Sequence, residues 1–298
     1  MIFYCHHANG DLFESKALIE AWRMGSYEQF SIAHKQSKRL FLDQPWLNQI
    51  ELSDWMDEQK PWVKSPDGET AVNLWIGRGY TNAPGNFTRY IEAGIGLYIE
   101  GHFLMHNDIR LELGLDPLPG TADDYWPDVY LMTPEHLGDA VLICNGPVRS
   151  LQAENFDFSP AILSACLAHP KIRFYATEKP FVPMAEFPPN LTLTDSLFPE
   201  KSDLPEICTL SRNCRLIVGR KSGPHVWAQS RSNLLHSAKT ILAFTVGPEA
   251  AWNVRPNNPK VQSRRKWMSA KTAEEAEFGL LETLNEAFTA IDKPSVMD

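Results

Sequence analysis

The sequence predicts an α/β protein of two Rossmann-like, doubly wound domains with an interdomain cleft. Short apolar runs alternate with segments of helical periodicity along both halves of the chain, as in parallel sheets with helices on both faces. The runs at 140–144 (AVLIC) and 215–219 (RLIVG) are almost wholly apolar, which is expected of strands covered on both sides. The length of 298 residues suits two domains of about 150 residues each.

The first half of the chain opens with a strand at 1–6 (MIFYCH). A helix is expected from about Leu12, because Asp11 and Glu14 have the spacing of a capping box. Further strands and a second helix are expected after it. The strands are 28–34 (EQFSIAH), 39–43 (RLFLD) and 71–77 (AVNLWIG), and the helix is 87–113.

A loop rich in proline, glycine and aspartate follows at 114–128, and it places a domain boundary just beyond it. The predicted domains are therefore 1–133 and 134–298, the second ending in a long helix at about 270–291. Its other elements alternate regularly. They are strands at 140–144, 172–176, 190–194, 215–219 and 239–245, and helices at 159–169, 203–211 and from 225.

Composition limits the function classes. A net charge of -9 and a pI near 5.5 argue against a general nucleic-acid-binding protein. The sequence has no apolar run of about 18 residues for a membrane span, and its first residues do not resemble a signal peptide. Five scattered cysteines fit reduced thiols in a cytoplasmic protein. A structural zinc site is not expected, because neither CxxC nor HExxH occurs. The acidic pair Asp123–Asp124 is interpreted as a solvated loop.

Ligands of open parallel sheets bind beyond the carboxyl ends of the strands. The most informative such stretch is RLIVGRKSGPHVWA at 215–228. A helix starting after Gly223 would offer free backbone N–H groups to a phosphate, and Arg220, Lys221 and His225 add positive or donor character. The alternative is an ordinary strand-to-helix turn with Ser222 as N-cap.

The segment LSRNCRLIVGRKSGPHVWAQ, followed by KTILAFTVGP, resembles the C-terminal domain of heptosyltransferase-like glycosyltransferases of the GT-B fold. The match rests on Ser222–Gly223–Pro224, His225, Ala228 and Gly247–Pro248. Gly10–Asp11 stands after the first strand, where the family has Gly-Asp. The chain departs from the family at Lys221, where an aspartate is usual, and in the spacing to the last strand. Because of these departures, the resemblance does not identify the sugar of the donor.

The resemblance implies a cytoplasmic enzyme of polysaccharide biosynthesis. It would move a sugar from a nucleotide-sugar donor to a hydroxyl acceptor, a glycan or lipid-linked saccharide, with inversion and without a metal or other cofactor. No nucleic-acid partner is expected, and peripheral contact with a membrane is compatible with a lipid-linked acceptor. Two alternatives remain: a GT-B-type nucleotide-sugar epimerase, and a non-catalytic protein that binds a glycan or another partner.

The resemblance also implies site residues. Asp11 would be the catalytic base, although helix capping explains it equally, and His7 is an alternate base or acceptor-binding group. Three further groups are expected. The acceptor side comprises Gly10, Arg78 and Tyr80; the donor diphosphate would be held by Arg149, Lys221, Ser222, Gly223 and His225; the nucleoside would be held by Thr177, Glu178 and Glu206. Arg149 could instead be a solvated loop residue, and Glu206 could serve only to cap the helix at 203–211.

Overall fold

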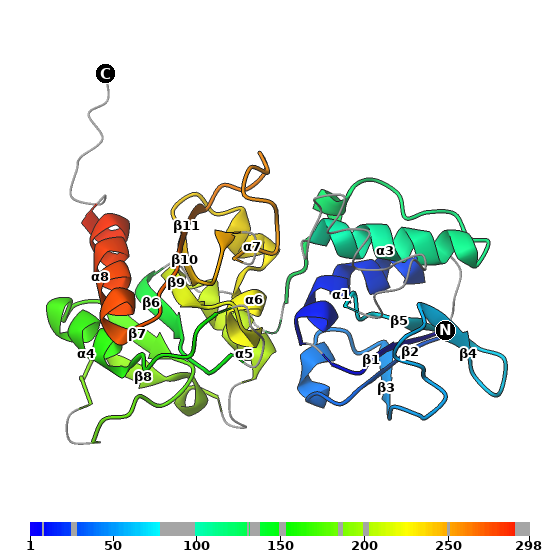
Figure 1. Ribbon diagram of the computed structural model, residues 1–298, viewed down its shortest axis with the longest axis horizontal. Helices are drawn as coiled ribbons and strands as arrows, with labels where there is room; N and C mark the ends of the chain where they lie inside the picture. The colour runs from blue at the N-terminus through cyan, green and yellow to red at the C-terminus, as the bar shows by residue number, and fades with distance from the viewer. Residues whose placement is uncertain are drawn as a thin grey trace. The chain divides into compact units, whose positions relative to one another are not determined.

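The computed structural model describes residues 1–7, 9–24, 29–77, 99–129, 131, 138–148, 153–183, 187–198, 203–248 and 251–289. The chain divides into two compact units, each built around one sheet (Figure 1). Unit 1 comprises Met1–Val129 and Asn253–Asn258, and unit 2 comprises Tyr130–Trp252 and Pro259–Asp298. The α/β class with two Rossmann-like sheets is confirmed. The short return of the chain to unit 1 at Asn253–Asn258 is not predicted by the sequence.

The sheet of unit 1 has the order β3-β2-β1-β5-β4. Its members are β1 (Ile2–Cys5), β2 (Phe30–His34), β3 (Leu47–Ile50), β4 (Trp62–Lys64) and β5 (Thr70–Asn73). All neighbours are parallel except β4, which runs antiparallel to β5. From β1 the chain adds strands first on one side and later, at β5, on the other. The switch point of this sheet therefore lies between β1 and β5.

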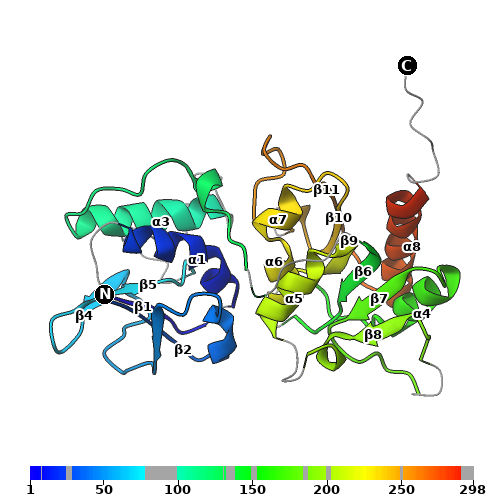
Figure 2. The ribbon, with the colours of Figure 1, turned by 180° about the vertical axis from the view of Figure 1, so that it is seen from behind.

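Helices α1 (Asn9–Arg23) and α3 (Ile99–Glu112) pack against each other beside this sheet (Figures 1 and 2). The short helix η2 (Ala122–Tyr125) follows α3. The strand expected at 39–43 is wrong, because Lys38–Phe41 forms the 3-10 helix η1. The Ser37 hydroxyl accepts a hydrogen bond from Arg39 N, and local turn bonds satisfy the neighbouring backbone. β3, which reads LNQI, takes the edge position instead.

Unit 2 has a six-stranded, fully parallel sheet of order β11-β10-β9-β6-β7-β8. Its members are β6 (Gly138–Cys144), β7 (Arg173–Ala176), β8 (Leu191–Leu193), β9 (Cys214–Arg220), β10 (Thr240–Phe244) and β11 (Arg264–Met268). Numbered within the unit, this is the 3-2-1-4-5-6 order of a dinucleotide-binding fold. Its switch point lies between β6 and β9.

Helices cover both faces of this second sheet (Figures 1 and 2). On one face α4 (Ser159–Ala168) and α8 (Ala273–Thr289) pack together over alternate residues of the central strands, including Val141, Phe174 and Val218. On the other lie α5 (Leu204–Ser211), α6 (Gly223–Ala228) and α7 (Arg231–Leu234). The short helix η4 (Thr194–Ser196) follows β8. No helix among the described residues is long and apolar enough to cross a membrane.

Candidate functional site

At the switch point of the unit 2 sheet, side-chain hydrogen bonds join the end of β9 to the loop after β6. Arg220, the last residue of β9, is 3% exposed. Its guanidinium donates to the carbonyl oxygens of Asn145 at 2.6 Å, Phe156 at 2.7 Å and Gly146 at 3.3 Å. It also lies over the Phe156 and Phe158 rings, and burial lowers its pKa. Arg220 therefore fixes the loop after β6 against the end of β9.

Asn145 completes this junction toward β7. Its side-chain amide donates to Glu178 O at 2.9 Å, and its Oδ1 accepts from Glu178 N at 2.9 Å. The Thr177 hydroxyl accepts from Asn145 N at 3.2 Å. Gly219 packs against the neighbouring strand, because a Cβ there would lie 2.6 Å from Cys144 Cβ. The predicted nucleoside residues Thr177 and Glu178 thus lie at this edge of the sheet, joined to the end of β6.

The loop from Lys221 to His225 leads from β9 into α6. Ser222 is the N-cap of α6 in extended conformation, and its side chain makes no capping hydrogen bond. Its hydroxyl has no partner among the described residues. Lys221 is buried, at 6% exposure. The loop therefore brings one cation and one unengaged hydroxyl to the β6–β9 edge, beside the start of a helix.

His225 lies inside the unit. It is fully buried, and its Nδ1 lies 3.2 Å from Gln229 Nε2. Burial, together with the nearby Lys221 charge, lowers its pKa to about 3, so the ring is neutral at physiological pH. A neutral, enclosed imidazole contributes no charge to a diphosphate. Arg149, the other predicted diphosphate residue, lies outside the described residues, as do Arg78 and Tyr80 on the acceptor side.

Glu206 has the capping function that its position predicts. The N-cap of α5 is Asp203, and the Glu206 carboxylate accepts from Asp203 N at 3.1 Å, which completes a capping box. This contact satisfies a backbone donor at the helix start. A contact of Glu206 with a nucleoside stays a prediction.

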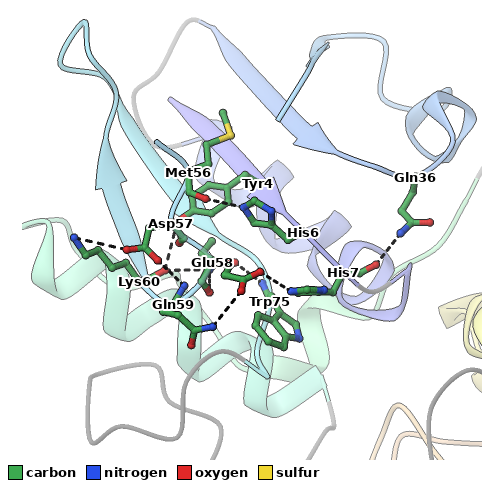
Figure 3. A network of polar contacts seen from close by, with 11 residues as sticks. Tyr4, His6, His7, Gln36, Met56, Asp57, Glu58, Gln59, Lys60 and Trp75 are labelled. Atoms are coloured by element: carbon green, nitrogen blue, oxygen red, sulfur yellow. Dashed lines mark hydrogen bonds and ion pairs between the residues drawn. The ribbon is translucent and has the colours of Figure 1, made fainter. Parts of the chain in front are cut away.

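At the switch point of unit 1, by contrast, the polar side chains are partly exposed to solvent (Figure 3). His7 follows β1, and its Nε2 lies 3.0 Å from Glu58 Oε2. The two side chains are 45% and 46% exposed. The His7 ring lies against Trp75, which follows β5, with 4.2 Å between ring centroids. Gln36, which follows β2, donates to His7 O at 2.7 Å. An imidazole, a carboxylate and an indole thus meet at the carboxyl edge of the sheet.

A groove of about 750 Å³ lies beside these residues. Its lining includes His6, Trp55, Glu58 and Trp62. His6 Nε2 lies 2.7 Å from Met56 O, which anchors the loop that carries Glu58. The lining combines aromatic, acidic and basic side chains, and so offers flat apolar faces together with hydrogen-bond acceptors and donors to a bound molecule.

Asp11 lies close by, but it is turned inward. Helix α1 begins at Asn9, so Asp11 stands within the first turn and the expected start near Leu12 is wrong. Its Oδ1 accepts from Ile76 N at 2.9 Å, and it lies 3.9 Å from His102 Nε2. Asp11 is 9% exposed, and burial raises its pKa. The carboxylate joins α1 to the segment after β5 rather than capping its own helix.

A second acidic residue of α1 completes this inward-facing group. Glu14 is 6% exposed, and its Oε2 lies 2.8 Å from Nε2 of His102, which belongs to α3. Among the residues that the structure describes, no group of three or more His, Cys, Asp or Glu side chains could hold a metal ion. None of the five cysteines forms a disulfide, and all five are buried.

The comparisons with known proteins agree with this architecture. No family model matches the chain, and no curated protein matches it. Among solved structures, it is similar to E. coli heptosyltransferase WaaC with ADP, at a TM-score of 0.54 and 10% identity over 96% of this chain and 100% of that one. It is also similar to E. coli ADP-heptose LPS heptosyltransferase II, at a TM-score of 0.53 and 13% identity over 98% and 99%.

A third similar structure is the glycosyltransferase TibC from enterotoxigenic E. coli H10407. The TM-score is 0.52 and the identity 12%, over 96% of this chain and 76% of that chain. At such identities the likeness establishes the fold. The chain has the two-domain fold of heptosyltransferases, and the predicted resemblance is confirmed at that level.

Proposed function

We propose that the protein transfers a sugar from a nucleotide-sugar donor to a hydroxyl group of a glycan or glycolipid. The observation that carries this proposal is the fold, which matches two heptosyltransferases over nearly their whole length. One of these two structures, that of WaaC, was solved with ADP. Five cysteines that form no disulfide support a cytoplasmic setting, and we place the reaction in polysaccharide biosynthesis.

The donor diphosphate is proposed to bind at the β6–β9 switch point, where open α/β sheets hold nucleotides. Lys221 brings a cation to this edge, Ser222 an unengaged hydroxyl and Gly223 the first residue of α6. Positive charge from Lys221 and from Arg149, which lies outside the described residues, would stabilise the leaving diphosphate without a metal. Thr177 and Glu178 lie at the same edge, where the nucleoside would bind.

The reaction needs a proton acceptor on the acceptor side, which we place in unit 1. The acceptor oxygen loses its proton and forms a bond to the anomeric carbon, while the bond from that carbon to the diphosphate breaks. Attack from the side opposite the leaving group inverts the anomeric centre. A side chain within hydrogen-bond reach of the attacking hydroxyl contributes about 10²–10⁴ to such a rate.

The test uses the full-length protein with ADP-, UDP- and GDP-sugars. Release of free nucleoside diphosphate is measured with and without acceptor extracts, and nucleotide binding is measured by calorimetry. Release that rises with acceptor supports transfer. An epimerised sugar would support the epimerase alternative, and the absence of both binding and release would overturn the proposal.

Two serines give a matched pair of variants for the donor site. Ser222 and Ser230 are both N-caps without a side-chain capping bond, and neither hydroxyl has a partner among the described residues. If Ser222 contacts the diphosphate, Ser222→Ala weakens nucleotide binding about ten- to a hundredfold, the range for hydrogen bonds to charged groups. Ser230→Ala leaves the affinity unchanged. Equal affinities in the two variants would contradict the placement of the diphosphate.

A further inference from the structure

Building on the proposed transferase function, we propose that His7 is its proton acceptor, that the accepting atom is Nδ1, and that Glu58 is the positioning residue that fixes this tautomer. The proposal rests on the contacts of His7 and Glu58 in unit 1 (Figure 3). It concerns which group removes the acceptor proton, a role that Asp11 or His7 could fill according to the sequence.

The tautomer follows from the chemistry of the pair. An ionised carboxylate can only accept hydrogen bonds, so His7 Nε2, at 3.0 Å from Glu58 Oε2, carries the hydrogen. In a neutral imidazole the other nitrogen then holds the lone pair. No hydrogen bond joins His7 Nδ1 to any described residue, and the side chain is 45% exposed. Nδ1 is therefore free to accept a proton from an incoming hydroxyl.

The pair is held in place by two side chains, one from the segment after β2 and one from β5. Gln36 fixes the His7 carbonyl through the hydrogen bond from its side-chain amide. On β5, Asn73 is fully buried, and its Nδ2 donates to Glu58 O at 2.9 Å and to Lys60 O at 3.0 Å. The same amide accepts from Trp75 N at 3.0 Å. A single buried asparagine thus positions both the backbone that carries Glu58 and the backbone of the indole against which His7 lies.

Asp11 is a less suitable acceptor on geometric grounds. It is 9% exposed, whereas a base must reach the hydroxyl of a bound substrate. Its Oδ1 already accepts from Ile76 N, and it lies 3.9 Å from His102 Nε2. Because Ile76 directly follows Trp75, the Asp11 contact supports the wall of the His7 site. Asp11 is accordingly assigned to structure.

The proton balance of the step is simple. The acceptor hydroxyl gives its proton to His7 Nδ1 as its oxygen bonds to the anomeric carbon, and the nucleoside diphosphate leaves with the electron pair of the broken bond. The imidazolium that forms is stabilised by the Glu58 carboxylate, as a carboxylate stabilises the histidine in other acid–base pairs. The proton then passes to water.

The experiment compares two histidine variants in the full-length protein. His7→Gln keeps a donor for Glu58 but has no basic nitrogen, so the transfer rate should fall by about 10²–10⁴ with nucleotide affinity unchanged. His169→Gln is the matched control, because His169 stands at the C-cap of α4 in unit 2, outside both proposed sites, and this variant should transfer within a few-fold of the parent. Thermal melting of both variants checks that each is folded.

Two further variants distinguish a role of His7 in proton transfer from a purely structural role. In His7→Ala, added free imidazole should restore part of the transfer rate, which it cannot do for a merely structural histidine. Glu58→Gln should lower the turnover number about tenfold or more with the Michaelis constants unchanged. The rescue of His7→Ala by imidazole should weaken when Glu58→Gln is added, because the carboxylate no longer orients the ring.

The outcomes distinguish this assignment from the proposed function. A parent protein that transfers sugar, with His7→Gln within a few-fold of its rate, overturns the assignment of His7 alone. A hundredfold loss in Asp11→Asn, which keeps an acceptor for Ile76 N, would assign the base to Asp11 instead. A parent that neither binds nucleotides nor transfers sugar overturns the transferase function, and the assignment with it.

Discussion

Arg220 and His7 occupy corresponding places, each directly at or after the end of a strand beside the switch point of its sheet. Arg220 is 3% exposed and donates to three carbonyl groups, whereas the His7 side chain is 45% exposed and contacts a carboxylate. The Arg220 side chain is part of the protein interior, and the His7 side chain faces solvent. The same topological position thus serves rigidity in unit 2 and leaves a reactive group accessible in unit 1.

The difference teaches how to weigh a polar side chain at a sheet edge. Position alone marks both Arg220 and His7 as candidates for ligand binding. Only the hydrogen-bond partners tell whether the side chain is available, because a donor that already satisfies buried carbonyls has little left for a ligand. Substitution of Arg220 should therefore change stability before it changes ligand binding.

The largest effect is expected at Arg220. Arg220→Ala removes the donors of three carbonyl groups and the contact with two phenylalanine rings, so the free energy of unfolding should fall by about 3 kcal/mol or more. Arg215, at the other end of β9, is the matched control. It pairs with the exposed Asp139, and Arg215→Ala should cost about 1 kcal/mol or less.

Calorimetric melting of the two arginine variants measures this contrast. If Arg220→Ala were as stable as Arg215→Ala but had lost nucleotide binding, the charge of Arg220 would be serving a ligand. The side chains at both switch points would then be available to a ligand, and the contrast between Arg220 and His7 would be wrong.

An intermediate effect is expected from pH, through His225. Its pKa is lowered to about 3 by burial, against about 6.5 for an unfolded histidine. Between these values the unfolded chain binds the proton and the folded chain does not, so stability is full above about pH 6.5 and falls with the pH by about 1.4 kcal/mol per unit. The contribution lost at pH 5 is about 2 kcal/mol.

Urea denaturation of the parent and of His225→Gln at pH 7, 6 and 5 tests this expectation. The variant lacks the titrating group, and its stability should fall less steeply over this range. Parallel curves for the two proteins would show that His225 takes up its proton in the folded state, as an exposed histidine would.

The smallest effect is expected at Glu206. Glu206→Ala removes the acceptor for Asp203 N and should cost about 0.5–1 kcal/mol, as losses of helix caps do, with unchanged affinity for ADP or any other nucleotide that binds. Glu206→Gln keeps an acceptor and should be nearly neutral. A nucleotide affinity that falls in both variants would instead place Glu206 at the ligand, in addition to its capping contact with Asp203 N.

The sequence predicts the central strands of both sheets well, because a strand buried on both faces is marked by its own apolar residues. It misses β3 (LNQI), β4 (WVK) and β11 (RRKWM), which lie at sheet edges or are partly exposed and carry polar or charged side chains. The 3-10 helix η1 resembles a strand in sequence because Leu40 and Phe41 are apolar. The 3-10 conformation depends on local turn hydrogen bonds, which leave no periodic pattern in the sequence.

The candidate site is predicted only in part. His7 and the Lys221–His225 loop are found because each follows a recognisable strand. Glu58 is missed because it lies 51 residues from His7 in the sequence and stands in a loop without a motif. The sequence also does not show that Arg220 and His225 are buried or what they contact, because burial and hydrogen-bond partners are properties of the folded chain. Contact of His225 with a diphosphate stays a prediction.

The return of Asn253–Asn258 to unit 1 has a consequence for how the protein is made. Asn253 O accepts from Ile99 N at the start of α3, Arg255 pairs with Glu100, and Asn258 donates to Asp123 at 2.6 Å. A ribosome adds about 5–20 residues per second, so residue 129 emerges long before residue 258. Unit 1 of the nascent chain therefore lacks these contacts until most of unit 2 has been synthesised. Its final contacts are made by residues that follow most of unit 2 in the chain.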